Sequence, residues 1–147
     1  MSPDQRLPGD RLLSPAMLLV VQGRAVSEAI ESRLTEIGLN LRQFGVLGHL
    51  ARSPGLSFTE LAVRASITVQ SMHSIVQNLT ELGLINGDGP TRGRSANLSL
   101  SETGRHRLRD AEEIVREVDA AWFGPDAELS WQALGDSLAA VGKRWTA

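Results

Sequence analysis

Between residues 68 and 82, the apolar positions of the chain recur at steps of three and four. The apolar residues are Val69, Met72, Ile75, Val76, Leu79 and Leu82, and this spacing places them on one side of a helix. Thr68 precedes them and can act as an N-cap, because its side chain can accept from free backbone N–H groups. The opposite side carries uncharged polar side chains, namely Gln70, His73, Ser74 and Gln77. The pattern predicts a helix with one apolar face and one face of hydrogen-bonding groups that suits contact with base edges in the DNA major groove.

The residues before this segment predict two further helices. Asn40 followed by Gln43 is typical of a capping box, and the apolar positions continue a helix to about residue 52. Ser53-Pro54-Gly55 ends that helix, and Leu56 predicts a very short strand. Ser57 and Glu60 form a second capping box, which opens a brief helix. With a turn at residues 66–67, residues 57–82 therefore predict a helix-turn-helix.

The residues after it predict a β-hairpin. Gly83 ends the helix, residues 84–86 read as a strand, and residues 87–94 are rich in turn-forming residues. Apolar and polar residues then alternate over 96–100, as in a half-buried strand. Arg92 and Arg94 fall near the tip of this hairpin. Two arginines in an exposed loop favour contact with phosphates or with a narrow minor groove.

Long helices are predicted at both ends of the chain. Residues 15–37, 102–123 and 130–144 carry apolar stripes at helical spacing. Such stripes need a partner surface, which indicates dimerisation. Residues 1–14 contain prolines, a glycine and charges, and we interpret them as a flexible arm.

Composition narrows the class of protein. A chain of 147 residues fits one domain with dimerisation arms. The absence of cysteine excludes disulfides and thiolate metal sites, and the three histidines lack metal-ligand spacing. We therefore expect no metal, no cofactor and no catalytic residue. The chain also lacks a long apolar run and a signal peptide, so we expect a cytoplasmic protein that does not enter the membrane.

Charge is unevenly distributed along the chain, although the net charge is −2. Residues 61–109 hold six basic and three acidic side chains, a net of +3, whereas residues 110–147 hold three basic and eight acidic side chains, a net of −5. The first sixty residues are neutral overall. A basic segment beside an acidic one is typical of a phosphate-facing surface with a separate end turned away from it.

Taken in order, these elements resemble the MarR family of winged-helix transcription regulators. The matching pieces are Leu61-Ala62, Thr68-Val69 through Leu79, Glu81-Leu82-Gly83-Leu84-Ile85, and Leu98-Ser99-Leu100-Ser101-Glu102-Thr103-Gly104, which corresponds to the family's Leu-Thr-x-x-Gly junction. The resemblance implies a mainly α fold with a small β-hairpin wing. It places a winged helix-turn-helix domain at 38–101 and dimerisation helices at 15–37 and 102–147. It further implies a homodimer on a pseudo-palindromic operator, and for many members release by a small aromatic or phenolic effector, whose site we do not assign.

We predict a DNA interface with double-stranded DNA as the partner. Its residues are Thr68, Gln70, Ser71, His73, Ser74, Gln77, Arg92 and Arg94. His73 leaves two interpretations open, hydrogen bonding by neutral imidazole or a pH-sensitive contact, because histidine titrates near pH ~6.5.

The chain departs from the family at the wing. The usual Asp-Arg-Arg corresponds here to Arg92-Gly93-Arg94, so only Arg94 carries over directly, and Arg92 is a less rigid substitute. An arginine frequent in the family's recognition helix is absent at Ser74 and Asn78. These departures leave an alternative hypothesis, a winged-helix protein-interaction adaptor with weak or no DNA binding.

Overall fold

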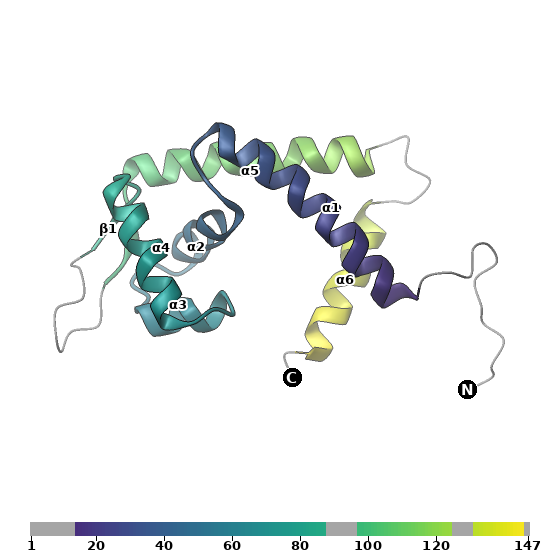
Figure 1. Cartoon of the computed structure of the whole chain (residues 1–147), viewed down its shortest axis with the longest axis horizontal. Coiled ribbons are helices and arrows are strands. Elements are labelled where there is room, and N and C mark those ends of the chain that lie inside the picture. Colours follow the sequence, from purple (N-terminus) through teal and green to yellow (C-terminus); the bar gives the residue numbers. More distant parts are fainter. Residues whose placement is uncertain (1–13, 88–96, 125–130, 146–147) are drawn as a thin grey trace.

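The computed structural model describes residues 14–87, 97–124 and 131–145. These residues form α1 (Pro15–Glu36), α2 (Leu41–Arg52), α3 (Phe58–Arg64), α4 (Val69–Glu81), β1 (Ile85–Asn86), β2 (Ser99–Leu100), α5 (Glu102–Phe123) and α6 (Trp131–Trp145). Figure 1 shows α2, α3, α4 and the small sheet gathered at one end, with α6 and the first turns of α1 at the other and α5 running between them. The predicted fold class, mainly helical with a small two-stranded wing, is confirmed.

Helix starts follow the capping residues recognised in the sequence. Asn40 and Gln43 exchange hydrogen bonds of 2.8 and 2.9 Å, each accepting from the other's backbone N–H, at the start of α2. Ser57 and Glu60 form the same reciprocal pair at the start of α3. Each pair satisfies backbone donors that have no partner inside the helix. Both helix starts are therefore determined by residues only three positions apart.

The sheet is short and antiparallel. Ile85 lies opposite Leu100, and Asn86 lies opposite Ser99. Leu56 adds an isolated bridge to Leu98, so the very short strand predicted at Leu56 is reduced to a single bridge. The second strand occupies Ser99–Leu100 of the predicted 96–100, and residue 96 lies outside the described residues. The sheet ties the start of the wing to the loop before α3.

The hydrophobic core lies in the winged part of the molecule. Residues of α2, α3, α4, the sheet and the first half of α5 contribute to it, among them Leu47, Leu50, Leu61, Met72, Leu79, Leu84 and Leu98, all less than 3% exposed. Burying an aliphatic side chain of this size contributes about 1.5–3 kcal/mol. The core therefore holds the helix-turn-helix and the base of the wing as one unit.

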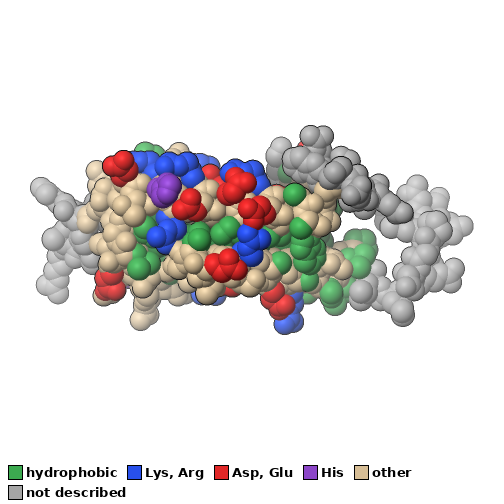
Figure 2. Space-filling view, turned by 90° about the horizontal axis from the view of Figure 1, so that it is seen from above, with side chains coloured by type: hydrophobic (Ala, Val, Ile, Leu, Met, Phe, Trp, Pro, Cys, Tyr) green, Lys and Arg blue, Asp and Glu red, His purple; other side chains and the backbone are tan. Residues whose placement is uncertain are grey.

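The first turns of α1 lie outside this core. Met17, Leu18, Leu19, Val20 and Val21 are each more than 40% exposed, as are Leu138 and Val141 of α6. Figure 2 shows hydrophobic side chains gathered at the end occupied by the first turns of α1, whereas acidic and basic side chains are mixed along the rest of this face. The apolar stripe predicted for residues 15–37 is therefore covered within one chain only at its C-terminal half, through Ile30, Leu34 and Ile37.

Polar contacts attach α1 to α5. Arg33 of α1 forms an ion pair with Glu117 of α5, and Arg107 of α5 donates to the backbone carbonyl of Ile37. These contacts fix the C-terminal half of α1 against the helix that leaves the wing. Across the three described ranges, no helix combines the length and apolar character that a membrane crossing requires.

Candidate nucleic-acid interface

Helix α4 presents a row of uncharged polar side chains to solvent. Gln70, Ser74 and Gln77 follow one another at helical spacing, and all three are exposed. Gln77 Nε2 donates to Glu81 Oε1 of the same helix over 3.2 Å, whereas the Gln70 amide forms no hydrogen bond within α4. Amide groups of this kind can pair with an adenine edge through two hydrogen bonds. The predicted recognition face is therefore open in the monomer.

Two of the predicted contacts are occupied in starting the helix. Ser71 N–H donates to Thr68 Oγ1 over 3.1 Å, and Thr68 Oγ1–H donates to Ser71 Oγ over 2.9 Å. Thr68 is therefore the N-cap of α4, as predicted. Ser71 is half-buried beside it. Both hydroxyls lie at the end of the helix that normally enters the groove first in a helix-turn-helix.

His73 packs against the preceding helix. Its imidazole stacks on the Phe58 ring, with centroids 4.1 Å apart and planes 19° from parallel. The side chain is half-buried, less open than Gln70 or Ser74. Phe58 was not recognised from the sequence as a partner of this face. The stack orients the imidazole edge and couples the start of α3 to the middle of α4.

Apolar burial and one polar bridge hold α4 in place. Met72, Val76 and Leu79 are buried, as the apolar periodicity predicts, but Val69 and Leu82 at the two ends of the stripe are 40% and 48% exposed. No neighbouring element of the described chain covers these two ends. The buried part of the apolar stripe is therefore shorter than the periodicity alone predicts.

Gln43 supplies the polar bridge. The residue is 8% exposed, and its Nε2 donates to Asn78 Oδ1 of α4 over 2.6 Å. The same Gln43 closes the α2 capping box, and Leu41 N–H next to it donates to Glu31 of α1 over 2.6 Å. Hydrogen bonds thus run from α1 through the start of α2 to the recognition helix. The sequence identified Gln43 as a cap residue but gave no signal for its second partner, 35 residues away.

The turn between α3 and α4 has a distinct backbone. Ser66 adopts φ +53°, in the left-handed region, and Ile67 N–H donates to Ala62 O over 3.0 Å. This closes the end of α3 and directs the chain into α4, as expected for a helix-turn-helix. The predicted turn at residues 66–67 is therefore where the chain reverses.

The base of the wing is fixed at the junction with α5. Ser101 Oγ–H donates to Gly83 O over 2.6 Å, and Ser101 Oγ accepts from Gly104 N–H over 2.9 Å. Ser101 therefore caps α5 and joins it to the end of α4. Arg92 and Arg94, the predicted wing contacts, lie outside the described residues.

A small basic group lies at the end of α2. Arg64 donates to Ser53 Oγ over 2.9 Å, and the Arg52 guanidinium lies 3.4 Å from His49 Nδ1. Burial lowers the pKa of His49, and the positive charges of Arg52 and Arg64 lower it further. Hydrogen bonds from Ser57 likewise lower the pKa of Glu60. The lowered pKa favours the neutral imidazole of His49, and the guanidinium groups of Arg52 and Arg64 supply positive charge here.

Within the described residues, no three histidine, aspartate or glutamate side chains come together in a way that could hold a metal ion. The arrangement on α4 suits recognition of a duplex rather than bond-making chemistry.

Comparison with known proteins identifies related regulators. A family model described as MarR family matches residues 37–95. The HTH-type transcriptional repressor Rv2887 of Mycobacterium tuberculosis is 36% identical over 104 residues, which is 70% of this chain and 75% of the relative.

Solved structures of related regulators match the fold of this chain. The crystal structure of Rv2887 of Mycobacterium tuberculosis in complex with DNA matches with a TM-score of 0.76 and 29% identity, covering 89% of this chain and 99% of that one. The complex of the same protein with p-aminosalicylic acid matches with a TM-score of 0.72 and 29% identity, covering 88% and 99%. A MarR family regulator from Rhodococcus sp. RHA1 shares the fold at 22% identity, with a TM-score of 0.77 over 90% and 96% of the two chains.

Proposed function

The chain belongs to the MarR family of winged helix-turn-helix transcription regulators, and we propose that it is a ligand-responsive repressor that binds a pseudo-palindromic operator as a homodimer. The predicted assignment to a regulator family rather than to an enzyme is confirmed. The observation that carries the DNA-binding role is the exposed row of Gln70, Ser74 and Gln77 on α4. This row is uncharged and open, and buried residues on the opposite side of α4 pack the helix against the core.

Exposed apolar residues support the homodimer. The five consecutive residues Met17–Val21 of α1 and Leu138 and Val141 of α6 expose an apolar surface that a single chain leaves in water. Burying such residues between two copies removes apolar area from water at about 25 cal/mol per Å². A second copy related by a two-fold axis would also place two α4 helices on successive half-sites.

A small aromatic or phenolic molecule is the effector that we propose. The related Rv2887 has been solved with salicylic acid and with p-aminosalicylic acid. The cytoplasm is the compartment that we expect, since a repressor has to reach chromosomal DNA.

Selection of bound duplexes from a random pool tests the proposed function. A repressor should enrich one pseudo-palindromic sequence, and light scattering should give the mass of a dimer. Failure to enrich any sequence at low salt would instead favour the adaptor hypothesis, which the altered wing sequence Arg92-Gly93-Arg94 motivates.

Replacing Gln70 by alanine should relax the preference at one base position. The exposed Gln70 amide can pair with the edge of one base. Its removal should therefore cost about 1–3 kcal/mol of binding free energy on operators with the preferred base and little on operators with another base at that position. Binding to all single-base variants of the selected operator measures this. Thr80→Ala is the matched control, because Thr80 is exposed on the same helix and bonds to Val76 O of its own backbone. A uniform loss over all sequences would contradict base reading by Gln70.

Replacing Arg94 by alanine should weaken binding to every sequence alike. If Arg94 neutralises a phosphate, the slope of log affinity against log salt should fall by roughly one. A salt titration on the selected operator measures the slope. Arg116→Ala serves as control, since Arg116 lies on α5 and pairs with Glu113. An unchanged slope would show that Arg94 does not contact a DNA phosphate.

A further inference from the structure

Helix α4 carries no lysine or arginine. With histidine counted as neutral, the only charged side chain of this helix is the carboxylate of Glu81 at its end. The attraction of a protein for the DNA backbone comes from lysine and arginine side chains that neutralise phosphates. The row of Gln70, Ser74 and Gln77 can therefore pair with base edges, but it supplies no positive charge. A duplex held at α4 needs cations from the elements beside it.

Two arginines meet where α2 and α3 end. Arg52 is the last residue of α2, and Arg64 is the last residue of α3. Arg64 Nη1 donates to Ser53 Oγ over 2.9 Å, which brings its guanidinium to the residue that follows Arg52. Burial lowers the pKa of His49, and the charges of both arginines lower it further, so both guanidinium groups lie near one imidazole. Both arginines are exposed, and we call this basic patch the α2–α3 corner.

The positive charge of the corner is not used within the described part of the chain. Neither Arg52 nor Arg64 forms an ion pair with a carboxylate of the described residues. Glu60 lies one turn before Arg64, but its carboxylate accepts from the backbone N–H and the hydroxyl of Ser57, each over 2.8 Å. The two guanidinium groups therefore remain available to an anion from outside the chain.

The corner adjoins both segments that are predicted to contact DNA. Arg64 lies four residues before Thr68, the N-cap of α4, at the end of the helix that normally enters the groove first. On the other side, Gly55 N–H donates to Leu98 O over 2.8 Å, and Leu56 forms an isolated bridge with Leu98 at the base of the wing. A duplex that contacts α4 and the wing therefore passes close to the corner.

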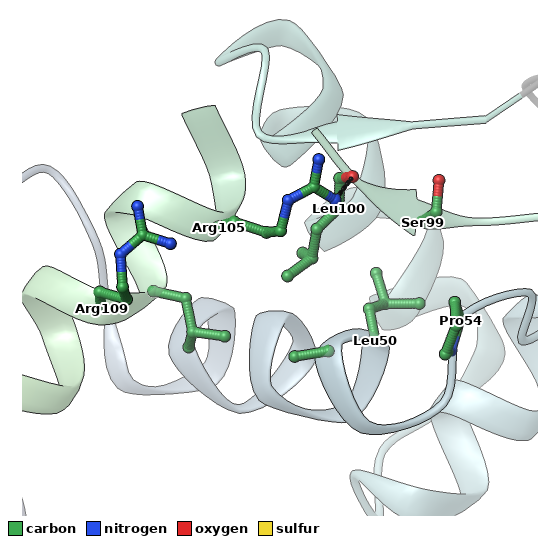
Figure 3. Close-up of a pocket in the computed structure, with 8 residues that line it drawn as sticks. Leu50, Pro54, Ser99, Leu100, Arg105 and Arg109 are labelled. Carbon is green, nitrogen blue, oxygen red and sulfur yellow. Dashed lines mark hydrogen bonds between the residues drawn. The ribbon is translucent and has the colours of Figure 1, made fainter. Parts of the chain in front are cut away.

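A second pair of arginines provides a comparison. Pro54 of the loop after α2 and Leu100 of β2 line a cavity of about 280 Å³, and Figure 3 shows Arg105 and Arg109 of α5 at the other end of this cavity from Pro54. Arg105 Nη1 donates to Leu100 O over 3.0 Å, and Arg109 Nη2 lies 3.3 Å from His106 Nδ1. Figure 1 shows α5 running away from α4 toward the opposite end of the molecule. This pair therefore carries the same charge as the corner on a helix that leads away from the recognition helix.

We propose that the α2–α3 corner is a phosphate-binding site that holds the DNA backbone beside the groove entered by α4, with Arg52 and Arg64 each neutralising one phosphate. The planar guanidinium matches the geometry of phosphate oxygens. The bond to Ser53 occupies one of its five N–H donors, so Arg64 keeps donors for a phosphate. Such contacts fix the position of the duplex without reading its sequence. The inference rests on the proposed function and adds a contact outside the interface predicted from the sequence.

Salt titrations by fluorescence anisotropy test the corner, with the selected operator and with a duplex of unrelated sequence. Arg52→Gln/Arg64→Gln should lower the slope of log affinity against log salt by about two, because each phosphate contact contributes about 0.9. Affinity should fall by the same factor for both duplexes. Arg105→Gln/Arg109→Gln removes an equal charge from α5 and should leave the slope unchanged. Ser53→Ala removes the partner of Arg64, keeps both charges and should also leave the slope unchanged.

Arg52→Lys/Arg64→Lys keeps both charges and should restore the slope of the unaltered chain, which a merely structural role of the arginines would not produce. Equal thermal midpoints show that all variants are folded. An unchanged slope for the corner pair, equal losses for the two arginine pairs, or a loss confined to the operator would overturn the proposal.

The duplex of unrelated sequence separates this inference from the proposed function. A chain that enriches no operator, but whose binding to that duplex loses about two units of slope in Arg52→Gln/Arg64→Gln, would contradict the sequence-specific repressor and support the phosphate site. A chain that binds no duplex even at low salt would overturn both.

Discussion

Replacing Gly104 by alanine should destabilise the protein more than the same change at any other described glycine of its winged part. A Cβ at this position would lie 1.9 Å from Leu84 O and 2.9 Å from the Leu84 carbonyl carbon. Leu84 cannot easily retreat, because it is buried and its carbonyl accepts from Ser101 N–H over 3.0 Å. The start of α5 and strand β1 must therefore separate, at a cost of about 3 kcal/mol or more.

Thermal denaturation followed by circular dichroism measures the effect of Gly104→Ala. A loss of this size should lower the midpoint by about 10 °C. Gly45→Ala is the matched control, because Gly45 lies inside α2 and a Cβ there meets no atom within 4 Å. Alanine is the better helix former by about 1 kcal/mol, so the control should be as stable as the unaltered chain or more so. Equal midpoints for the two variants would mean that the close approach of α5 to Leu84 is absent in solution.

This close approach gives a physical reason for the glycine in the junction motif. In Leu98-Ser99-Leu100-Ser101-Glu102-Thr103-Gly104, Ser101 caps α5 and bonds to Gly83, while Gly104 lets the helix touch the chain that leaves α4. The sequence identifies the motif through its resemblance to the family's Leu-Thr-x-x-Gly junction. The backbone contact that requires glycine joins residues 20 positions apart, so it emerges only from the folded structure.

The fold was predictable because its local signals agree with one another. Capping boxes at Asn40 and Ser57 and the N-caps Thr68 and Ser101 act through partners three residues away, which the sequence displays directly. The side-chain bridges between elements were not predictable in this way. Gln43–Asn78 and Phe58–His73 each join different helices, and no periodicity specifies which residues meet across them.

The candidate interface was predictable in part for the same reason. Helical spacing correctly placed Gln70, Ser74 and Gln77 on the exposed side of α4. It could not show that His73 is drawn against Phe58, or that Ser71 serves the N-cap. Nor could it show the cavity of about 280 Å³ between α2 and the consecutive elements β2 and α5, because α2 lies far from these two elements in the sequence.

Replacing Ser74 by glutamate should reduce operator binding by at least about a hundredfold, the largest functional effect expected of a single change on α4. Ser74 lies between Gln70 and Gln77 on the exposed row, and its Oγ–H bonds over 3.4 Å to the carbonyl of Gln70 in its own helix, so the fold does not depend on it. A carboxylate there would face the phosphates and the acceptor-rich base edges of the major groove. A like charge at an interface costs several kcal/mol, which corresponds to a loss of roughly two or more orders of magnitude in affinity.

Ser74→Gln isolates the charge from the size of the side chain. Glutamine and glutamate have nearly the same shape and similar helix propensity, so the two variants should have equal thermal midpoints and equal dimer mass. In fluorescence anisotropy with the selected operator, Ser74→Gln should bind far more tightly than Ser74→Glu, and rising salt should narrow the difference as phosphate repulsion is screened. Comparable affinities for the two variants would place the middle of α4 away from DNA. The duplex would then have to be held by another surface of the winged domain.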